Sequence, residues 1–343
     1  MRRRTFLSAS LGLGALLGLA PLGAYRQPSP RARGAGPALA EMTLVSGSGL
    51  AFGTTVTIKV LHDDAWAAEA AIEDALRQVR KIDSLMSLHQ EQSQVVALNR
   101  RAIVTAPDQH LLYVLGFSQQ LSRLTAGAFD ITVQPLWPVF RLACDRGALP
   151  EREQIAAAKN LVNWQRLELG RRQVRLQKAG MAITLNGVAQ GYAVDVALAA
   201  LHKHGVRHAL LDTGEFGSMG RKTGGQPWML GIAHPRRHEA VAARVVMDGR
   251  KVATSGDYAT FFSPDFVHHH IFDPATGDSP SELASVTVVA PTGILADGLS
   301  TAFMVMGADR SLALAARLPG VDAMLIDKNG AIRSTAHFPT APT

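Results

Sequence analysis

The chain has 343 residues, of which 47% are hydrophobic, enough for one large or two modest domains with a real core. Its net charge of +7 arises mostly in residues 1–41, which hold six of the 35 basic residues and one of the 28 acidic ones, leaving 29 and 27. This near-balance gives no support to nucleic acid as a partner. No internal apolar run reaches the ~18 residues of a membrane-spanning helix.

The first residues predict an export signal. Arg2–Arg4 precede an apolar, Gly- and Ala-rich run that reaches about Ala20, with small residues up to Ala24. The Arg3-Arg4 pair is typical of the twin-arginine type, which exports folded proteins. We therefore expect residues 1–24 to be a signal peptide and the protein to be periplasmic. A membrane anchor that stays attached is the alternative.

Residues 25–48 are rich in Pro, Gly, Ala and Ser, which predicts a linker ahead of one domain at residues 49–335. The only cysteine is Cys144, so no intramolecular disulfide forms. We interpret Cys144 as a buried filler rather than a nucleophile.

Hydrophobic periodicity predicts the elements. An alternating run at Thr54–Leu61 is a strand, and Ala65–Ile82 is an amphipathic helix. A second helix is expected at His110–Thr125, ended by Gly127. Further strands are expected at Arg166–Leu169, Gln173–Gln177, Ala182–Leu185, Ala209–Thr213, Trp228–Ala233, Arg244–Met247, Val252–Thr254, Ser285–Ala290 and Ala323–Asp327, and further helices at Glu151–Lys159, Val196–His204, Ile294–Gly307 and Ser311–Leu318.

Two glycine-rich segments that directly follow expected strands are candidate ligand sites. Gly187–Asp195 joins a strand to a helix, the shape that presents backbone amides to a phosphate. It lacks the GxGxxG and GxxxxGKS patterns, so neither a nicotinamide site nor a P-loop is supported, and a purely structural turn stays open. Gly214-Glu215 follows another strand, where a ligand can approach the backbone closely.

Asp297 and Thr301 lie four residues apart on the helix expected at Ile294–Gly307, so they project from one face. A carboxylate and a hydroxyl are hard oxygen donors and favour a Mg²⁺ or Ca²⁺ site. A capped helix with a solvated Asp297 is the alternative.

Three consecutive histidines, His268, His269 and His270, invite a metal interpretation. In a strand, neighbouring side chains point to opposite faces, so at most His268 and His270 share a site. A zinc site and a single functional histidine both stay open.

Taken together, these stretches resemble the ApbE family, the FAD:protein FMN transferases, over about Gly49 to Asp327. The order and spacing of the pieces carry the resemblance. The pieces are Gly53-Thr54, Ile82–Ser87 with Ser93 and Leu98-Asn99, Gly127–Leu136, Gly187–Asp195, Gly214, His234-Pro235, Thr254–Tyr258, His270–Gly277 and Asp297–Thr301.

The resemblance implies an α+β fold of mixed or antiparallel sheets with packed helices, and a flavin site between subdomains. It implies a divalent metal, usually Mg²⁺ with Ca²⁺ as the alternative, bound by Asp297, Thr301 and the backbone carbonyl of Ala189. It makes His270 the candidate catalytic histidine. Asp257, in the Ser-Gly-Asp-Tyr turn, is a second candidate base.

The resemblance also implies that FAD, the substrate, contacts Asp195 at its adenosine end. The other residues expected at the FAD site are Gly187, Gly191, Gly214, Glu215 and His89. Three positions depart from the family pattern: Gln190 where Lys is frequent, Glu215 in place of a second glycine, and His89 where an aromatic side chain often faces the flavin. The Asp-Thr-Gly-Glu variant and the twin-arginine leader resemble the branch associated with nitrous-oxide respiration.

The activity implied is metal-dependent transfer of FMN from FAD to a threonine of an acceptor flavoprotein of the membrane or periplasm, with release of AMP. Two alternatives stay open: an FAD pyrophosphatase in which water attacks, and a periplasmic flavin-binding protein without chemistry. The oxygen donors of Asp297 and Thr301 argue against the carrier, because a carrier need not polarise a diphosphate.

Overall fold

The computed structural model describes Leu39 and residues 42–341, apart from the side chain of His238. The predicted signal peptide, residues 1–24, and most of the predicted linker lie outside the described residues. No helix in the described part of the chain combines the length and the apolar character needed to cross a membrane.

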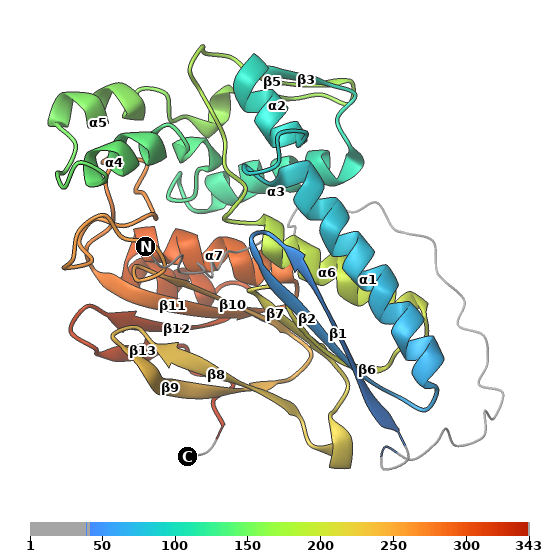
Figure 1. Ribbon diagram of the computed structural model, residues 1–343. Coiled ribbons are helices and arrows are strands. Elements are labelled where there is room, and N and C mark those ends of the chain that lie inside the picture. Colours follow the sequence, from blue (N-terminus) through green and yellow to red (C-terminus); the bar gives the residue numbers. More distant parts are fainter. Residues whose placement is uncertain (1–38, 40–41, 342–343) are drawn as a thin grey trace.

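The described elements are strands and helices that often follow one another in runs of the same kind along the chain (Figure 1). In chain order they are β1 (Thr43–Ala51), β2 (Thr54–His62), α1 (Ala65–Met86), α2 (Gln94–Arg101), β3 (Ile103–Thr105), α3 (Gln109–Leu124), η2 (Ile131–Val133), α4 (Leu136–Cys144), α5 (Arg152–Lys159), η3 (Trp164–Arg166), β4 (Leu167–Leu169), β5 (Gln173–Leu176), α6 (Ala189–Lys203), β6 (His208–Asp212), β7 (Phe216–Met219), η4 (Thr223–Gly225), β8 (Trp228–His234), β9 (Arg237–Met247), β10 (Lys251–Gly256), β11 (Leu283–Ala290), α7 (Gly293–Met306), α8 (Ala308–Ala315), β12 (Asp322–Asp327) and β13 (Ile332–Ser334).

Eight strands form one antiparallel sheet in the order β1-β2-β6-β7-β10-β11-β12-β13. Helices α1, α6 and α7 cover one face, and the β8–β9 hairpin packs against part of the other (Figure 1). Strand β11 lies between these layers, and all eight of its residues are buried. This explains its continuous run of apolar and small residues, since it has no solvent-facing side.

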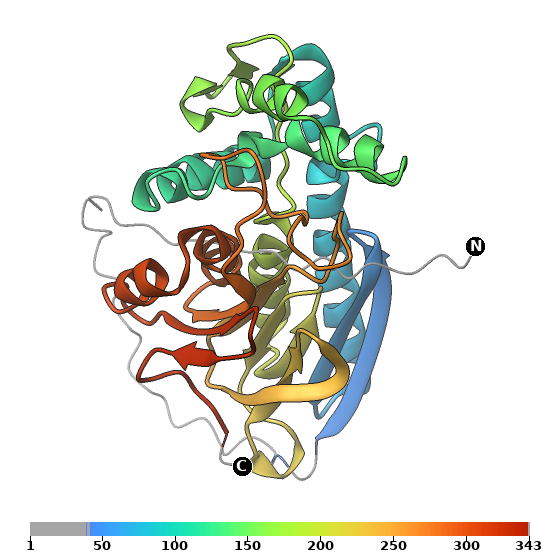
Figure 2. The same ribbon diagram turned by 90° about the vertical axis from the view of Figure 1, so that its left-hand side faces the viewer.

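A second layer of helices α2 to α5 with the small sheet β3-β5-β4 lies on the helical side of the large sheet (Figure 2). Phe140 and Leu136 of this layer form a cluster with Phe262 and Phe272, which belong to the long connection between β10 and β11. The connection therefore ties the upper layer to the sheet. The α+β architecture expected from the resemblance is confirmed.

Several expected elements differ from the structure. The expected linker reached residue 48, but β1 begins at Thr43 and pairs with β2 along its whole length. The strand expected at Ala182–Leu185 is extended but unpaired with any strand. Its backbone instead bonds to a side chain, because Asn99 both accepts from the Ile183 N–H at 2.7 Å and donates to the Ile183 carbonyl at 2.9 Å.

Helix α6 begins at Ala189, seven residues before the expected start at Val196, so all of the Gly187–Asp195 stretch except its first two residues is helical. This brings Gly191 into its first turn, against the start of α7. A Cβ added to Gly191 would lie 2.4 Å from the Gly293 carbonyl oxygen, and one added to Gly293 would lie 2.3 Å from the Gly191 carbonyl oxygen. The two helices meet backbone to backbone, which only glycine allows.

We predict that Gly191→Ala lowers the free energy of unfolding by about 1–3 kcal/mol, the usual effect of overpacking against rigid backbone. Gly116→Ala is the matched control, because Gly116 lies inside α3 and its added Cβ would meet only ordinary contact at 3.9 Å. Alanine there should raise stability by about 0.5–1 kcal/mol. Urea denaturation measures both, and a Gly191→Ala protein as stable as the wild type would contradict the close approach.

Candidate active site

Asp195 fastens α6 to α7. Its Oδ1 accepts a hydrogen bond from the Gly293 N–H at 2.7 Å, and its Oδ2 accepts one from the Ile294 N–H at 2.8 Å. Burial nevertheless raises the pKa of Asp195 to about 6. Both oxygens already serve the helix junction, so the expected contact of Asp195 with adenosine stays a prediction.

Asp297 is completely buried and faces the start of α6. Its Oδ2 accepts a hydrogen bond from the Gly191 N–H at 2.7 Å, while its Oδ1 has no hydrogen-bond donor among the described residues. Burial, and next the carboxylate of Glu215, raise the pKa of Asp297 well above its usual range. A buried carboxylate oxygen without a donor is costly, and a cation beside it would remove that cost.

Thr301 lies one turn further along α7. Its hydroxyl is 3.2 Å from that of Ser255, and its Oγ1 is 4.0 Å from the position that a Cβ of Gly187 would occupy. Thr301 therefore stands between strand β10 and the glycine turn, on the side toward which Asp297 points. The structure brings together the two side chains that the sequence paired.

The backbone amides at this junction are mostly engaged. The Ala189 N–H donates to the Leu185 carbonyl at 2.9 Å, and the Gly191 N–H donates to Asp297. At the start of α7, Asp195 and the capping Thr292 accept from the first amides. The phosphate-cradling interpretation of the glycine turn is therefore weakened, and a diphosphate bound here needs another source of positive charge.

The donor set fits a hard divalent cation. Carboxylate and hydroxyl oxygens of Asp297 and Thr301 are ligands that Mg²⁺ and Ca²⁺ prefer. Ala189, the third expected ligand, is the buried first residue of α6, so helical geometry directs its carbonyl to the amide four residues on and leaves its second lone pair for a ligand. No group of three or more His, Cys, Asp or Glu side chains in the described chain is arranged to hold a metal. Hydroxyl, carbonyl or substrate oxygens would have to complete the coordination.

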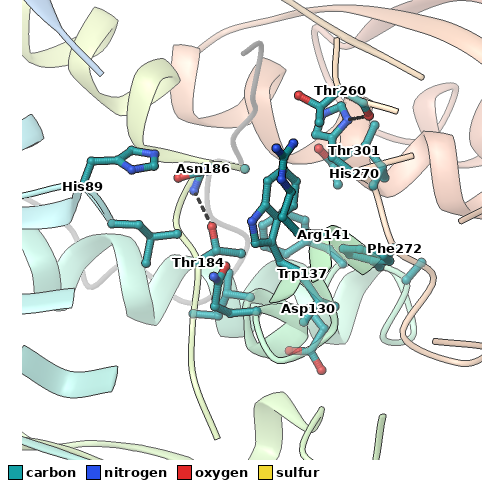
Figure 3. A pocket seen from close by; sticks show the side chains of 18 residues that line it. His89, Asp130, Trp137, Arg141, Thr184, Asn186, Thr260, His270, Phe272 and Thr301 are labelled. Atoms are coloured by element: carbon teal, nitrogen blue, oxygen red, sulfur yellow. Dashed lines mark hydrogen bonds between the residues drawn. The ribbon is translucent and has the colours of Figure 1, made fainter. Parts of the chain in front are cut away.

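A cavity of about 450 Å³ opens between the upper helical layer and the sheet (Figure 3). This volume falls in the range of small-molecule sites. Its walls are largely aromatic and apolar, with Thr301 on one side connecting it to the α6–α7 junction. The lining residues used below are His89, Phe129, Trp137, His270, Phe272 and Thr301.

Asp130 borders the cavity, but its carboxylate points away from it (Figure 3). It accepts from the backbone and hydroxyl of Thr132, both at 2.7 Å, and from the Trp164 N–H at 2.9 Å. Within the Gly127–Leu136 stretch, Asp130 therefore stabilises the turn and closes the loop.

His270 lines the cavity, and one nitrogen of its ring is engaged by the backbone. Its Nδ1 lies 3.0 Å from the Thr260 carbonyl oxygen, which can only accept, so Nδ1 carries the hydrogen and Nε2 keeps a lone pair. Burial lowers the pKa of His270, while the Thr260 carbonyl and the charge of Asp257 act in the opposite direction. The ring is therefore neutral and able to accept a proton at neutral pH.

The other two histidines hold the loop. The His268 Nδ1 pairs with the Asp278 Oδ1 at 2.8 Å, and the His269 Nε2 lies 3.1 Å from the Pro280 carbonyl oxygen. Burial lowers the pKa of His269 to about 3. The three residues lie in a loop and each has a different partner, so the described structure does not bring His268 and His270 together as ligands of one zinc ion.

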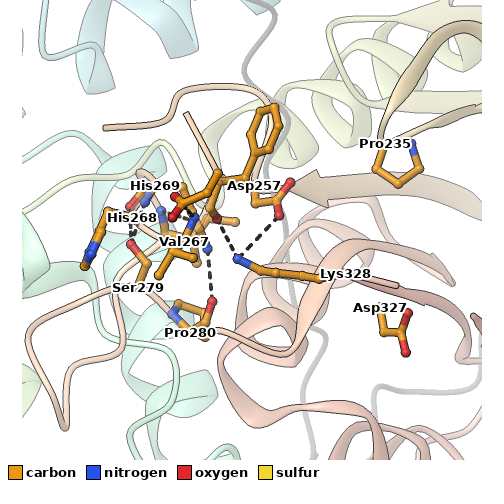
Figure 4. A network of polar contacts seen from close by, with 12 residues as sticks. Pro235, Asp257, Val267, His268, His269, Ser279, Pro280, Asp327 and Lys328 are labelled. Atoms are coloured by element: carbon orange, nitrogen blue, oxygen red, sulfur yellow. Dashed lines mark hydrogen bonds and ion pairs between the residues drawn. The ribbon is translucent and has the colours of Figure 1, made fainter. Parts of the chain in front are cut away.

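Asp257 is buried in an ion-pair network rather than presented to the cavity (Figure 4). The Arg236 guanidinium donates to both of its oxygens at 2.7 Å, and the Lys328 Nζ lies 3.6 Å from Oδ2. Because cations engage both oxygens, this geometry gives no support to Asp257 as a base, and that role stays a prediction. Its position explains how the loop that carries His270 is anchored to the sheet.

The Gly214-Glu215 exit from β6 reaches the same junction. Gly214 has φ 98°, which favours glycine, and its N–H donates to Asp212. Glu215 is buried, and its Oε2 accepts from the Thr254 N–H at 3.3 Å. Sequence reasoning placed Glu215 at the FAD site but missed its approach to Asp297, because no spacing relates two side chains 82 residues apart.

We predict that Arg236→Ala destabilises the protein by about 3–5 kcal/mol, because it removes the main cationic partner of the buried Asp257 carboxylate. Because Lys328 still pairs with Asp257 in this variant, we expect the loss of stability to lie in the lower part of that range. Arg333→Ala is the matched control, because its 2.7 Å pair with Asp309 is exposed and worth less than about 1 kcal/mol. Chemical denaturation checks both, and equal effects of the two variants would refute the anchoring role.

Comparison with known proteins agrees with this architecture. A protein named FAD:protein FMN transferase from Salmonella typhimurium is 31% identical over 295 residues, covering 82% of this chain and 84% of the relative. The crystal structure of Pseudomonas stutzeri flavinyl transferase ApbE in its apo form superposes with a TM-score of 0.75 at 31% identity, over 88% of this chain and 98% of that one. The ApbE protein of Thermotoga maritima gives a TM-score of 0.77 at 28% identity, over 86% and 98%.

The ApbE family model matches residues 52–325, which is most of the chain and includes both glycine exits, the His270 loop and helix α7. The resemblance inferred from the motifs is therefore confirmed by three separate comparisons. This chain belongs to the ApbE family.

Proposed function

We propose that this protein is an FAD:protein FMN transferase, the activity in the name of its Salmonella typhimurium relative. The observation that carries the proposal is the buried Asp297 carboxylate, whose Oδ1 lacks a donor among the described residues beside a cavity of small-molecule size. A protein that only stored flavin would gain nothing from this costly arrangement.

In this proposal FAD is the substrate. Its flavin ring occupies the cavity against Phe129, Trp137 and Phe272, and its diphosphate reaches the α6–α7 junction. Asp297 and Thr301 would hold a Mg²⁺ or Ca²⁺ ion there, which when bound would neutralise phosphate charge and stabilise the charge that develops as the diphosphate is cleaved.

The reaction is a phosphoryl transfer to an acceptor protein. The hydroxyl oxygen of an acceptor threonine attacks the FMN-side phosphorus, and the bond from that phosphorus to the AMP oxygen breaks. FMN stays on the threonine as a phosphate ester, and AMP leaves. Nε2 of His270 takes the hydroxyl proton, because Nδ1 is committed to the Thr260 carbonyl.

The predicted twin-arginine signal, residues 1–24, leads us to propose export to the periplasm. The acceptor is then a threonine-bearing flavoprotein of the membrane or periplasm. The support for this location is the residue pattern of the leader alone.

We predict that Asp297→Asn abolishes FMN transfer, because it removes the charge that would hold the cation. Mass spectrometry of a co-expressed threonine-bearing acceptor measures the gain of the FMN mass. Asp322→Asn, which changes another buried carboxylate that pairs with Arg250 at 2.6 Å, should leave transfer intact. Normal transfer by Asp297→Asn would refute the role of this side chain.

Rapid release of AMP from FAD and Mg²⁺ without any acceptor would favour the pyrophosphatase.

We predict that His270→Gln slows transfer by about 10²–10⁴-fold, the range that a general base contributes. His268→Gln is the control in the same loop, because the His268 ring pairs with Asp278. Since burial lowers the pKa of His270, the wild-type rate should hold constant down to about pH 6.5 and fall only below it, as the ring becomes protonated. A rate that falls already between pH 8 and 7, or equal rates for the two variants, would count against His270.

A further inference from the structure

Exposed arginines gather around the small sheet β3-β5-β4, at the end of the upper helical layer that faces away from the large sheet (Figure 1). They come from the end of α2 and from the segment that runs from η3 through β4 and β5. We call these side chains the arginine patch. Its members are Arg100, Arg101, Arg166, Arg171, Arg172 and Arg175.

Strand pairing holds the two segments of the arginine patch together. Arg175 lies opposite Ile103 of β3 on one side and opposite Glu168 of β4 on the other. At the turn between β4 and β5, the Arg172 carbonyl accepts a hydrogen bond from the Ala106 N–H at 2.9 Å. The arginines are therefore carried by one hydrogen-bonded backbone, although they lie far apart in the sequence.

Most of these arginines have no acidic partner. Arg100 pairs with Glu91 at 3.0 Å, and no other member of the patch has an ion pair or a side-chain hydrogen bond within the part of the chain that the structure describes. Glu168, the acidic residue opposite Arg175, instead accepts a hydrogen bond from Gln177 at 2.7 Å. Guanidinium groups gathered in this way repel one another, and an anionic partner would relieve that repulsion.

The charge of the protein is divided unevenly. Residues 100–105 and 166–178 hold seven basic residues and one acidic residue, a net charge of +6. Residues 42–343 as a whole hold 29 basic and 27 acidic residues, so the rest of that range holds 22 and 26, a net charge of −4. The near-balance of the chain therefore combines a strongly positive surface with an otherwise acidic molecule.

The chemistry of the patch favours a membrane surface over a protein. None of the large hydrophobic side chains exposed in the described chain belongs to residues 100–105 or 166–178. Protein interfaces depend on a few buried aromatic and apolar side chains, and single-stranded nucleic acids stack on aromatic ones. Clusters of about four to eight basic residues without such a centre are typical of binding to anionic lipid headgroups.

We propose that the arginine patch docks this protein on a membrane surface that contains anionic lipids. The binding is electrostatic, so it is reversible and weakens as the ionic strength rises. Docking would hold the enzyme beside the membrane acceptors of the proposed function. The inference rests on the patch alone and makes no use of the flavin site.

The test is co-sedimentation of the full chain with vesicles of phosphatidylcholine alone or with about 30% phosphatidylglycerol, whose headgroup is anionic. We expect the wild type to bind the anionic vesicles at least about tenfold more tightly than the neutral ones, and to lose this preference in about 0.5 M NaCl. The triple variant Arg171→Gln/Arg172→Gln/Arg175→Gln should bind the anionic vesicles about 100-fold more weakly, since each arginine near the surface contributes about fivefold.

The matched control is Arg77→Gln/Arg317→Gln/Arg333→Gln, which removes the same charge from exposed positions outside the patch and should bind like the wild type. All of these proteins carry the same residues 1–41, so the leader contributes equally to each. Equal affinity of the wild type and the patch variant, or an equal loss in the two variants, overturns the proposal. Absence of binding to the anionic vesicles also overturns it, and leaves an acidic protein as the partner to be sought.

A second measurement needs no variant and locates the contact. Hydrogen–deuterium exchange of the wild type should slow in peptides that cover residues 100–105 and 166–178 when anionic vesicles are added, and should not slow with neutral vesicles. Slower exchange only in other peptides, including those of residues 1–41, contradicts docking through the patch. Neither measurement involves FAD, so failure here leaves the proposed transferase untouched.

Discussion

The close approach of α6 and α7 is the constraint on which the rest of the site depends. Gly191 and Gly293 let the two backbones touch, Asp195 joins the helices through two amides, and Asp297 crosses back to the Gly191 N–H. Because the helices meet without intervening side chains, the Asp297 carboxylate is completely buried yet adjoins the cavity through Thr301. A looser junction would admit water and lose the strong electrostatics of a dry site.

The second constraint is the long connection between β10 and β11. Phe262 and Phe272 pack with the upper helical layer, while Asp257 at its start is held by Arg236 and Lys328. A buried ion pair contributes little net stability but fixes geometry, because any other arrangement leaves a charge unpaired. The connection is therefore held at its start and again at Phe262 and Phe272, and the His270 ring between these two phenylalanines is directed into the cavity by the Thr260 carbonyl.

The α6–α7 junction and the cavity present different chemical groups. The α6–α7 junction offers oxygen donors and negative charge, whereas the cavity offers aromatic surface and a neutral imidazole. FAD has a corresponding division, with charged phosphates at its centre, which a cation held at the junction would neutralise, and a flat ring at each end. The fit between these two divisions supports FAD as the substrate more strongly than either part does alone.

The sequence by itself determined the family, most elements and the Asp297/Thr301 pair, because periodicity, glycine positions and a four-residue helical spacing are local properties. It did not determine that β1 begins at Thr43 or that the backbone at Ile183 bonds to Asn99. Only the tertiary structure decided that Asp257 is a buried anchor, that the amides of the glycine turn are engaged, and that Glu215 meets Asp297. These outcomes depend on which distant groups share one buried volume, and the energy of a buried charge is set by those neighbours rather than by its place in the chain.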